Sequence, residues 1–222
     1  MFQDRREAGI KLAENLAKYS GEKDVIVIAL PRGGVVVGAE IAKKIGAPLD
    51  VIITHKIGFP GESEFAIGAI SENGKLELND SIVTRYNIPQ SYLDEEISRQ
   101  KAEIERRLIA YRGGKKLPSM KDKIIILVDD GVATGFTMIA AIKALNEEGL
   151  KKLVVAIPLS PEETFLKLKS LSDEIICLEI PEIFLAIGNF YYDFEQTTDD
   201  EVKELMQNIE FKRKDSNNKT IH

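Results

Sequence analysis

The chain has 222 residues, of which 44% are hydrophobic and 30% are charged, and its formal net charge is −6. This composition is typical of a packed domain and excludes disorder over the whole length. No apolar run approaches the ~20 residues of a membrane-spanning helix, and the first residues lack the apolar core of a secretory signal. Cys177 is the single cysteine, and the surplus of basic residues expected of a nucleic-acid binder is absent. We therefore expect a cytoplasmic protein with neither a membrane nor a nucleic-acid partner.

Predicted strands and helices alternate along most of the chain. Short runs rich in β-branched residues predict buried strands at 24–30, 49–56, 123–130, 152–159 and 174–179. Apolar residues at helical spacing predict helices between or before them at 4–19, 34–45, 136–148 and 161–171. Continuous apolar strands separated by helices favour an α/β fold, in which helices cover both faces of a central parallel sheet.

Residues 57–120 break this alternation. Asn73-Gly74 lies between two short strand-like runs and predicts a hairpin, and residues 91–111 form a charged helical pattern. We interpret 57–120 as an inserted hairpin–helix flap within a single domain spanning 1–210. The final residues have no apolar face, so we expect 211–222 to be a disordered tail.

The strand at 123–130 ends in two adjacent carboxylates, Asp129 and Asp130, and a glycine- and threonine-containing loop then leads into a helix. Small residues let backbone amides approach an anion, and the start of a helix adds partial positive charge. Acids beside a phosphate cradle suit a ligand that offers hydroxyls or a metal, such as a sugar phosphate with Mg²⁺. The generic P-loop and dinucleotide-binding patterns are both absent.

This segment resembles the signature with which type I phosphoribosyltransferases bind phosphoribosyl pyrophosphate (PRPP). The resemblance implies that Asp129 and Asp130 hold the ribose hydroxyls, directly or through Mg²⁺, and that the following loop binds the 5′-phosphate. The loop residues assigned to PRPP in this way are Gly131, Ala133, Thr134, Gly135, Phe136 and Thr137. Many 6-oxopurine enzymes of the family have an aspartate where this chain has Ala133, so the loop is more similar to that of adenine phosphoribosyltransferases.

Two further segments resemble parts of the same family. Arg32 and Gly33 follow the first strand, as in the pyrophosphate loop of bacterial xanthine-guanine enzymes. A glycine lets the backbone approach an anion, and an arginine can donate two parallel hydrogen bonds to phosphate oxygens. The alternative for Arg32 is a solvated loop arginine. Lys56 resembles the lysine that opens the mobile catalytic loop. The resemblance makes Arg32 and Lys56 the catalytic residues that hold the leaving group.

Other polar residues near Lys56 have weaker support. We expect His55 to pack at the end of its strand. Glu62 and Glu64 would reach the site as a general acid or base if the loop closes, but solvated loop carboxylates are the favoured interpretation.

The C-terminal region 180–210 is rich in aromatic residues, and in this family a variable hood recognises the base. The aromatic side chains either stack on a nucleobase or, as we favour, dock the terminal segment on the core. They are Phe190, Tyr191, Tyr192 and Phe194.

Nearly the full chain resembles a poorly characterised group of predicted bacterial and archaeal phosphoribosyltransferases. The resemblance implies a type I phosphoribosyltransferase fold and a pentosyltransferase that uses Mg²⁺ and PRPP. Such an enzyme transfers ribose 5-phosphate to a nitrogenous base or amine and releases pyrophosphate. A non-catalytic regulator that binds PRPP is the main alternative, and hydrolysis or pyrophosphate exchange is another. Homodimers are common in the family.

Overall fold

The body of the protein is built on a five-stranded parallel sheet. The computed structural model describes residues 1–218, apart from the side chains of Glu64 and of residues 210–218. The strand order is β2 (Leu49–Val51), β1 (Val25–Ala29), β6 (Ile124–Val128), β7 (Lys152–Leu159) and β8 (Glu174–Glu179). All four pairs of neighbours are parallel. The predicted α/β fold with a central parallel sheet is therefore confirmed.

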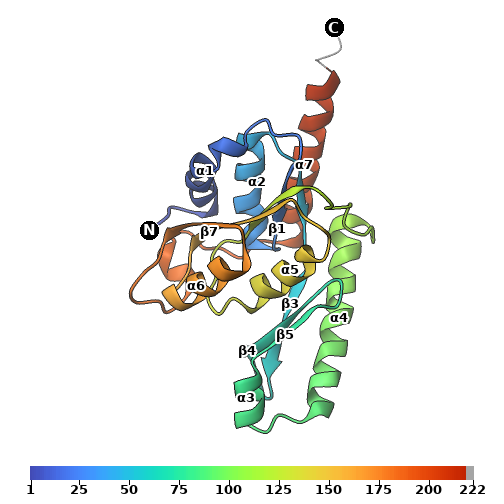
Figure 1. Ribbon diagram of the computed structural model, residues 1–222, viewed down its shortest axis with the longest axis vertical. Helices are drawn as coiled ribbons and strands as arrows, with labels where there is room; N and C mark the ends of the chain where they lie inside the picture. Colours follow the sequence, from blue (N-terminus) through green and yellow to red (C-terminus); the bar gives the residue numbers. More distant parts are fainter. Residues whose placement is uncertain (219–222) are drawn as a thin grey trace.

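Helices cover both faces of this sheet (Figure 1). Ile126 and Val128 of β6 pack in one apolar cluster, whereas Ile125 and Leu127 of the same strand pack in a second one. Because side chains alternate across a strand, the two clusters lie on opposite faces. Residues of α1 (Arg5–Asn15), α2 (Gly33–Ile45) and α7 (Asp199–Asn218) join the first cluster, and residues of α5 (Phe136–Asn146) and α6 (Glu162–Leu171) join the second.

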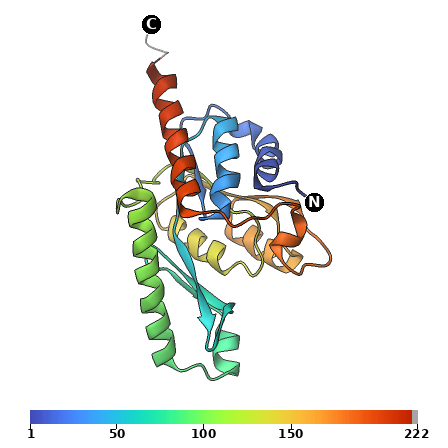
Figure 2. The same ribbon diagram turned by 180° about the vertical axis from the view of Figure 1, so that it is seen from behind.

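A separate antiparallel unit, residues 54–112, projects from the body and is called the arm here. Its three strands are β3 (Thr54–Phe59), β4 (Glu62–Ser71) and β5 (Leu76–Leu78), and its helices are α3 (Asp80–Arg85) and α4 (Gln90–Arg112). Figures 1 and 2 show the arm extending from one end of the body and α7 from the other. The hairpin at Asn73-Gly74 and the long helix are present as predicted.

The prediction of a single strand at 49–56 is wrong. The run divides into β2, which belongs to the parallel sheet, and β3, which pairs with β4 in the arm. The backbone amide of Ile52 donates to the carbonyl of Ala29 in the body, whereas that of Ile53 donates to the Glu72 carboxylate at 2.8 Å. Both residues are buried, so hydrophobicity is continuous across the point where the hydrogen-bond partners change.

A buried ion pair holds the root of the arm. Arg112 at the end of α4 donates from Nη2 to the Glu72 carboxylate at the β4–β5 turn. Their side chains are only 5% and 8% exposed. Burial raises the pKa of Glu72, although Arg112 and the Ile53 amide act against that rise. Within the described residues, Nε and Nη1 of Arg112 are buried without a hydrogen-bond partner.

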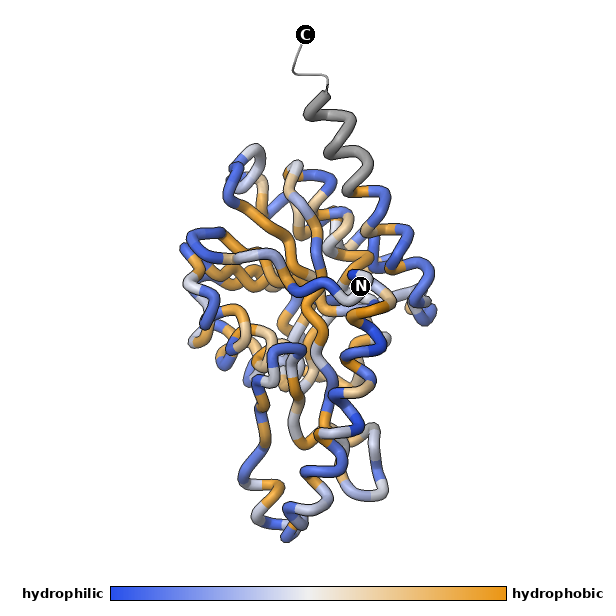
Figure 3. Tube along the Cα trace, turned by 90° about the vertical axis from the view of Figure 1, so that its right-hand side faces the viewer, coloured by the Kyte–Doolittle hydropathy of each residue, from blue (hydrophilic) through white to orange (hydrophobic). Residues whose placement is uncertain are grey.

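The C-terminal helix reaches further than the sequence indicated. Residues 211–218, expected in a disordered tail, continue α7, while 219–222 lie outside the described residues. Val202, Leu205 and Ile209 recur at helical spacing and pack in the first cluster, which explains how the helix is fixed to the body. Figure 3 shows hydrophobic stretches gathered in the interior of the body. No helix in the described part of the chain has the length and apolarity that crossing a membrane requires.

Candidate active site

Two loops meet at the carboxyl ends of the neighbouring strands β1 and β6. Ala29 is paired with Val128, and the amide of Leu30 donates to the Val128 carbonyl at 2.9 Å. The loop containing Arg32 and Gly33 therefore lies beside Asp129 and Asp130. A Cβ at Gly33 would come within 1.9 Å of Asp130 Oδ2, so only glycine permits this approach. In open α/β sheets, ligands bind at this edge.

The acid pair is held by residues from both ends of the chain. Asp130 Oδ2 accepts a 2.6 Å hydrogen bond from Arg5 Nε, and the two side chains are 13% and 11% exposed. The backbone carbonyl of Asp130 accepts a 2.6 Å hydrogen bond from the Tyr191 hydroxyl. Asp129 Oδ1 accepts from the backbone amide of Asp130 at 2.8 Å. Burial and the neighbouring Asp130 charge raise the pKa of Asp129.

The loop after the acid pair leaves the start of α5 open. Gly135 precedes the helix at φ +85°, and no side chain caps the first amides. Thr164 supports the back of the loop by donating to the Ala133 carbonyl at 2.7 Å. Thr134 is exposed and Thr137 is half-buried. Free amides at a helix N-terminus with adjacent hydroxyls form a site suited to a phosphate group.

The loop containing Arg32 and Gly33 also precedes a helix whose first amides have no side-chain cap. No side chain caps α2, which begins at Gly33, and the Pro31–Arg32 peptide is cis. Arg32 lies immediately before this helix. The structure thus brings Arg32, Gly33 and the acid pair together. Lys56 lies on β3, opposite Ala69 of β4, and so belongs to the arm.

Asp199, the first residue of α7, connects the arm to the loop containing Arg32. Its carboxylate lies 3.7 Å from Arg32 Nη1 and 3.1 Å from Arg106 Nη1 of α4, and it accepts a hydrogen bond from the Tyr111 hydroxyl. The Tyr111 hydrogen bond and Arg106 lower the pKa of Asp199. Hydrogen bonds from Arg106 and Arg107 lower the pKa of Glu103 to about 2. No local pattern in the sequence predicted this cluster.

The remaining polar candidates lie in the arm. His55 is half-buried with Nδ1 lacking a partner among the described residues, and burial lowers its pKa, which agrees with the packing interpretation. Glu62 is exposed, and the side chain of Glu64 lies outside the described residues.

The C-terminal aromatics dock the chain termini. Tyr191 is buried, with ring centroids 5.4 Å from Phe2 and 5.0 Å from Phe194. The amide of Phe2 donates to the Phe190 carbonyl, and the amide of Tyr192 donates to the Phe2 carbonyl. The Tyr192 side chain remains 72% exposed. The favoured docking interpretation is therefore confirmed for Tyr191.

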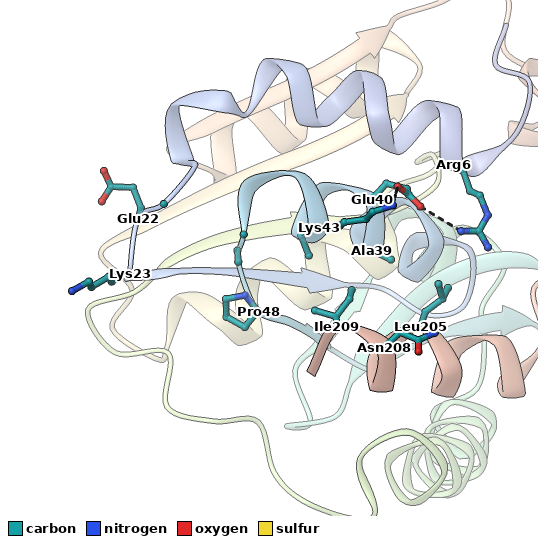
Figure 4. A pocket seen from close by; sticks show the side chains of 14 residues that line it. Arg6, Glu22, Lys23, Ala39, Glu40, Lys43, Pro48, Leu205, Asn208 and Ile209 are labelled. Atoms are coloured by element: carbon teal, nitrogen blue, oxygen red, sulfur yellow. Dashed lines mark hydrogen bonds and ion pairs between the residues drawn. The ribbon is translucent and has the colours of Figure 1, made fainter. Parts of the chain in front are cut away.

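A different hollow of about 810 Å³ lies between α2 and α7 (Figure 4). Lys23 at its edge lies two residues before β1, and Pro48 immediately precedes β2. It therefore reaches the amino ends of these strands, opposite the edge that carries the acid pair. None of its lining residues belongs to the predicted site.

Most of the chain matches the sequence model of a known family. Residues 2–195 match the family model of the phosphoribosyl transferase domain. The chain belongs to this family. A protein of Mycobacterium tuberculosis, provisionally named a phosphoribosyl transferase, is 41% identical over 202 residues. The match covers 91% of this chain and 45% of the relative, so the chain spans about half the length of that protein.

Two other proteins extend the comparison. The crystal structure of TT1426 from Thermus thermophilus is 42% identical, covers 93% of this chain and 97% of its own, and superimposes with a TM-score of 0.75. A ribose-phosphate pyrophosphokinase of Sulfurisphaera tokodaii is 27% identical over 158 residues, which is 69% of this chain and 50% of that protein. The fold is that of the type I phosphoribosyltransferases, as the sequence predicted.

Proposed function

We propose that the protein binds Mg²⁺-PRPP and transfers its ribose 5-phosphate to a nitrogenous base or amine, with release of pyrophosphate. The observation that carries this proposal is the meeting of two uncapped helix starts on either side of an acid pair. One ligand that carries phosphate at both ends and hydroxyls between them suits all three features.

Each part of the site then has one task. The loop from Thr134 to Thr137 holds the 5′-phosphate, and Asp129 and Asp130 accept hydrogen bonds from the ribose hydroxyls. The uncapped start of α2, which begins at Gly33, offers backbone amides to the pyrophosphate, and Arg32 donates two hydrogen bonds to its oxygens.

The site fits Mg²⁺ as an ion carried in by the substrate. No group of three His, Cys, Asp or Glu side chains among the described residues is arranged to hold a metal alone. Mg²⁺ commonly binds to one or two carboxylates together with substrate phosphates and water. Asp129 and Asp130 would therefore meet it through water or through ribose hydroxyls. When bound, it supplies positive charge to the departing pyrophosphate.

Catalysis in this proposal is mainly electrostatic. Bond breaking at the ribose leaves charge on pyrophosphate, which Arg32 neutralises directly and Lys56 neutralises from the arm. The arm would also exclude water and so suppress hydrolysis of PRPP. Asp199 contacts both Arg32 and α4, which gives the arm a physical connection to the pyrophosphate loop.

We infer that 6-oxopurines are poor acceptors. Ala133 can neither accept nor donate a proton through its side chain, so it cannot assist at the purine N7 as an aspartate there would. Adenine or a non-purine amine is the better-suited acceptor. Efficient turnover of hypoxanthine or guanine would contradict this inference.

The deciding experiment measures pyrophosphate release from PRPP at fixed Mg²⁺, with and without a panel of bases and amines. We expect release that depends on one class of acceptor. Release without any acceptor would indicate hydrolysis. PRPP binding without release under every condition would favour a regulator, and no PRPP binding would overturn the proposal.

A further inference from the structure

We propose that Arg5 is a positioning residue of the ribose site, which orients the Asp130 carboxylate toward the sugar hydroxyls. This inference rests on the proposed function, because it assigns a role within the same site. Arg5 lies in the first turn of α1, and Asp130 follows it by 125 residues. The sequence alone gives no reason to connect the two.

Arg5 is fixed on several sides. Nε donates to Asp130 Oδ2 at 2.6 Å, and Nη1 donates to the backbone carbonyl of Glu195 at 2.7 Å. Its guanidinium carbon lies 3.8 Å from the centroid of the Phe194 ring. A planar, delocalised guanidinium can make these contacts together. A lysine ammonium cannot stack on the Phe194 ring and at the same time donate hydrogen bonds to both oxygens in this geometry.

The same guanidinium touches the pyrophosphate loop. A Cβ at Gly33 would come within 2.6 Å of Arg5 Nε as well as within 1.9 Å of Asp130 Oδ2. The Arg5–Asp130 pair therefore fills the space beside Gly33. The hydrogen bond from Arg5 to Oδ2 holds the Asp130 carboxylate in one orientation, and the remaining lone pairs of this group can accept a hydrogen bond from a ligand.

This contact has a direct consequence for binding. A buried carboxylate without a partner is costly and adopts other orientations or partners. Arg5 removes that cost before the ligand arrives, so the sugar meets a carboxylate that is already oriented. Its loss should weaken the binding of a ribose phosphate and leave the binding of pyrophosphate, held at Arg32 and Gly33, largely intact.

The test uses calorimetry with ribose 5-phosphate and inorganic pyrophosphate as separate probes of the full chain. Arg5→Gln removes the charge and the planar guanidinium, whereas Arg5→Lys keeps the charge. Asp130→Asn removes the carboxylate with which Arg5 pairs. Arg6→Gln is the matched control, because the neighbouring Arg6 is largely exposed and pairs with Glu40 at 3.3 Å. Thermal unfolding of each variant reports any general loss of structure.

We expect Arg5→Gln to weaken ribose 5-phosphate binding about tenfold or more, Arg5→Lys to restore part of it, and Arg6→Gln to have no effect. Pyrophosphate affinity should not change. Adding Arg5→Gln to Asp130→Asn should weaken binding little further, because both act through one carboxylate.

Unchanged ribose 5-phosphate affinity in Arg5→Gln, or effects of the two substitutions that simply add, would overturn the inference while the proposed function stands. An equal loss of affinity for both probes would show that Arg5 has only a general structural role, and this result would also overturn the inference. Failure of the wild-type protein to bind ribose 5-phosphate and PRPP would instead overturn the proposed function itself, and the inference with it.

Discussion

The body and the arm place charged residues in different ways. In the body, Arg5 and Asp130 are a mostly buried pair at the edge of the parallel sheet, between two open helix starts. In the arm, the buried pair of Arg112 and Glu72 lies at the root, where it joins α4 to the β4–β5 turn. The two pairs are similarly sheltered from water. They differ in what surrounds them, and only the first is adjacent to loops that suit phosphate groups.

Burial of an ion pair therefore does not by itself identify a ligand site. The Arg112–Glu72 pair connects the end of α4 to the turn between β4 and β5, and breaking it should loosen the arm. The Arg5–Asp130 pair connects the first turn of α1 to the loop after β6, a strand that the sheet already fixes, so breaking it should affect binding more than stability.

The largest expected effect comes from replacing both acids of the pair. Asp129→Asn combined with Asp130→Asn should weaken Mg²⁺-PRPP binding by about 3 to 6 kcal/mol, since two hydrogen bonds from ligand hydroxyls to charged groups are lost. The fold should remain intact, because the sheet does not depend on these side chains. Calorimetry on the folded double variant measures the change. Unchanged PRPP affinity would remove the acid pair from the site.

The next effect concerns the arm. Arg112→Met should reduce the free energy of unfolding by about 3 to 5 kcal/mol, because Glu72 is left as a buried charge without its partner. Burial already raises the pKa of Glu72, and loss of Arg112 should raise that pKa further. A raised pKa in the folded state means that stability is lost as pH rises through it. The penalty should therefore shrink as pH falls.

Urea unfolding at several pH values measures this effect, and Glu72→Gln combined with Arg112→Met is the matched control. The double variant should regain part of the lost stability and lose its pH dependence. Ribose 5-phosphate affinity should be unchanged in both proteins under conditions where they are folded. A loss of affinity there would show that the root of the arm belongs to the ligand site after all.

A smaller effect is expected at the phosphate loop. Thr137→Ala removes one hydroxyl donor, and the loss of a hydrogen bond to a charged group costs about 1.5 to 3 kcal/mol. PRPP affinity should fall accordingly, with little change in thermal stability. Gly135→Val should be more severe, because this position has φ +85° and an added Cβ would lie 3.0 Å from Thr164 Cγ2. Full PRPP affinity in both variants would contradict the phosphate assignment.

The smallest effect is a pH dependence of the charged cluster that α4 forms within itself and with Asp199 of α7. The pKa of Glu103 is lowered to about 2 and that of Asp199 is also lowered. A lowered pKa in the folded state gives stability that is present above the unfolded value, near 4.5 for Glu103, and lost as pH falls toward the folded one. Because these pairs are partly exposed, we expect about 1 kcal/mol or less.

Hydrogen exchange of the α4 amides between pH 5 and about 2 checks this last prediction. Protection in the second half of α4 should decrease before protection in the parallel sheet does. In Glu103→Gln the decrease should be reduced, because one of the two titrating groups has been removed. Simultaneous loss of protection in α4 and in the sheet would contradict a separate response of the arm.

The sequence predicted the body well because its signals there are local. Apolar runs such as that of β6 and the glycine after α2 specify strands and helix ends without knowledge of the rest of the chain. The order of acids, glycines and threonines from Asp129 to Thr137 likewise indicated a phosphate loop, and the structure places the Arg32 loop beside it. The parallel sheet brings the two together.

The parts that were missed depend on contacts between distant residues. Arg5, Asp199 and Arg112 each lie in charged stretches that are typical of solvated surface, and their partners lie 125, 93 and 40 residues away. The split of 49–56 into β2 and β3 was missed because the run stays apolar while its hydrogen-bond partners change. Pro60-Gly61, with Gly61 at φ +81°, was the local signal of the unpredicted β3–β4 hairpin.

The central claim is that the loop after β6 and the acid pair bind one sugar phosphate. A crystal structure with ribose 5-phosphate tests it most directly. We expect phosphate on the amides and hydroxyls of Thr134 to Thr137, with the ribose hydroxyls against Asp129 and Asp130. Phosphate bound elsewhere, for example in the hollow between α2 and α7, with this loop empty, would contradict it.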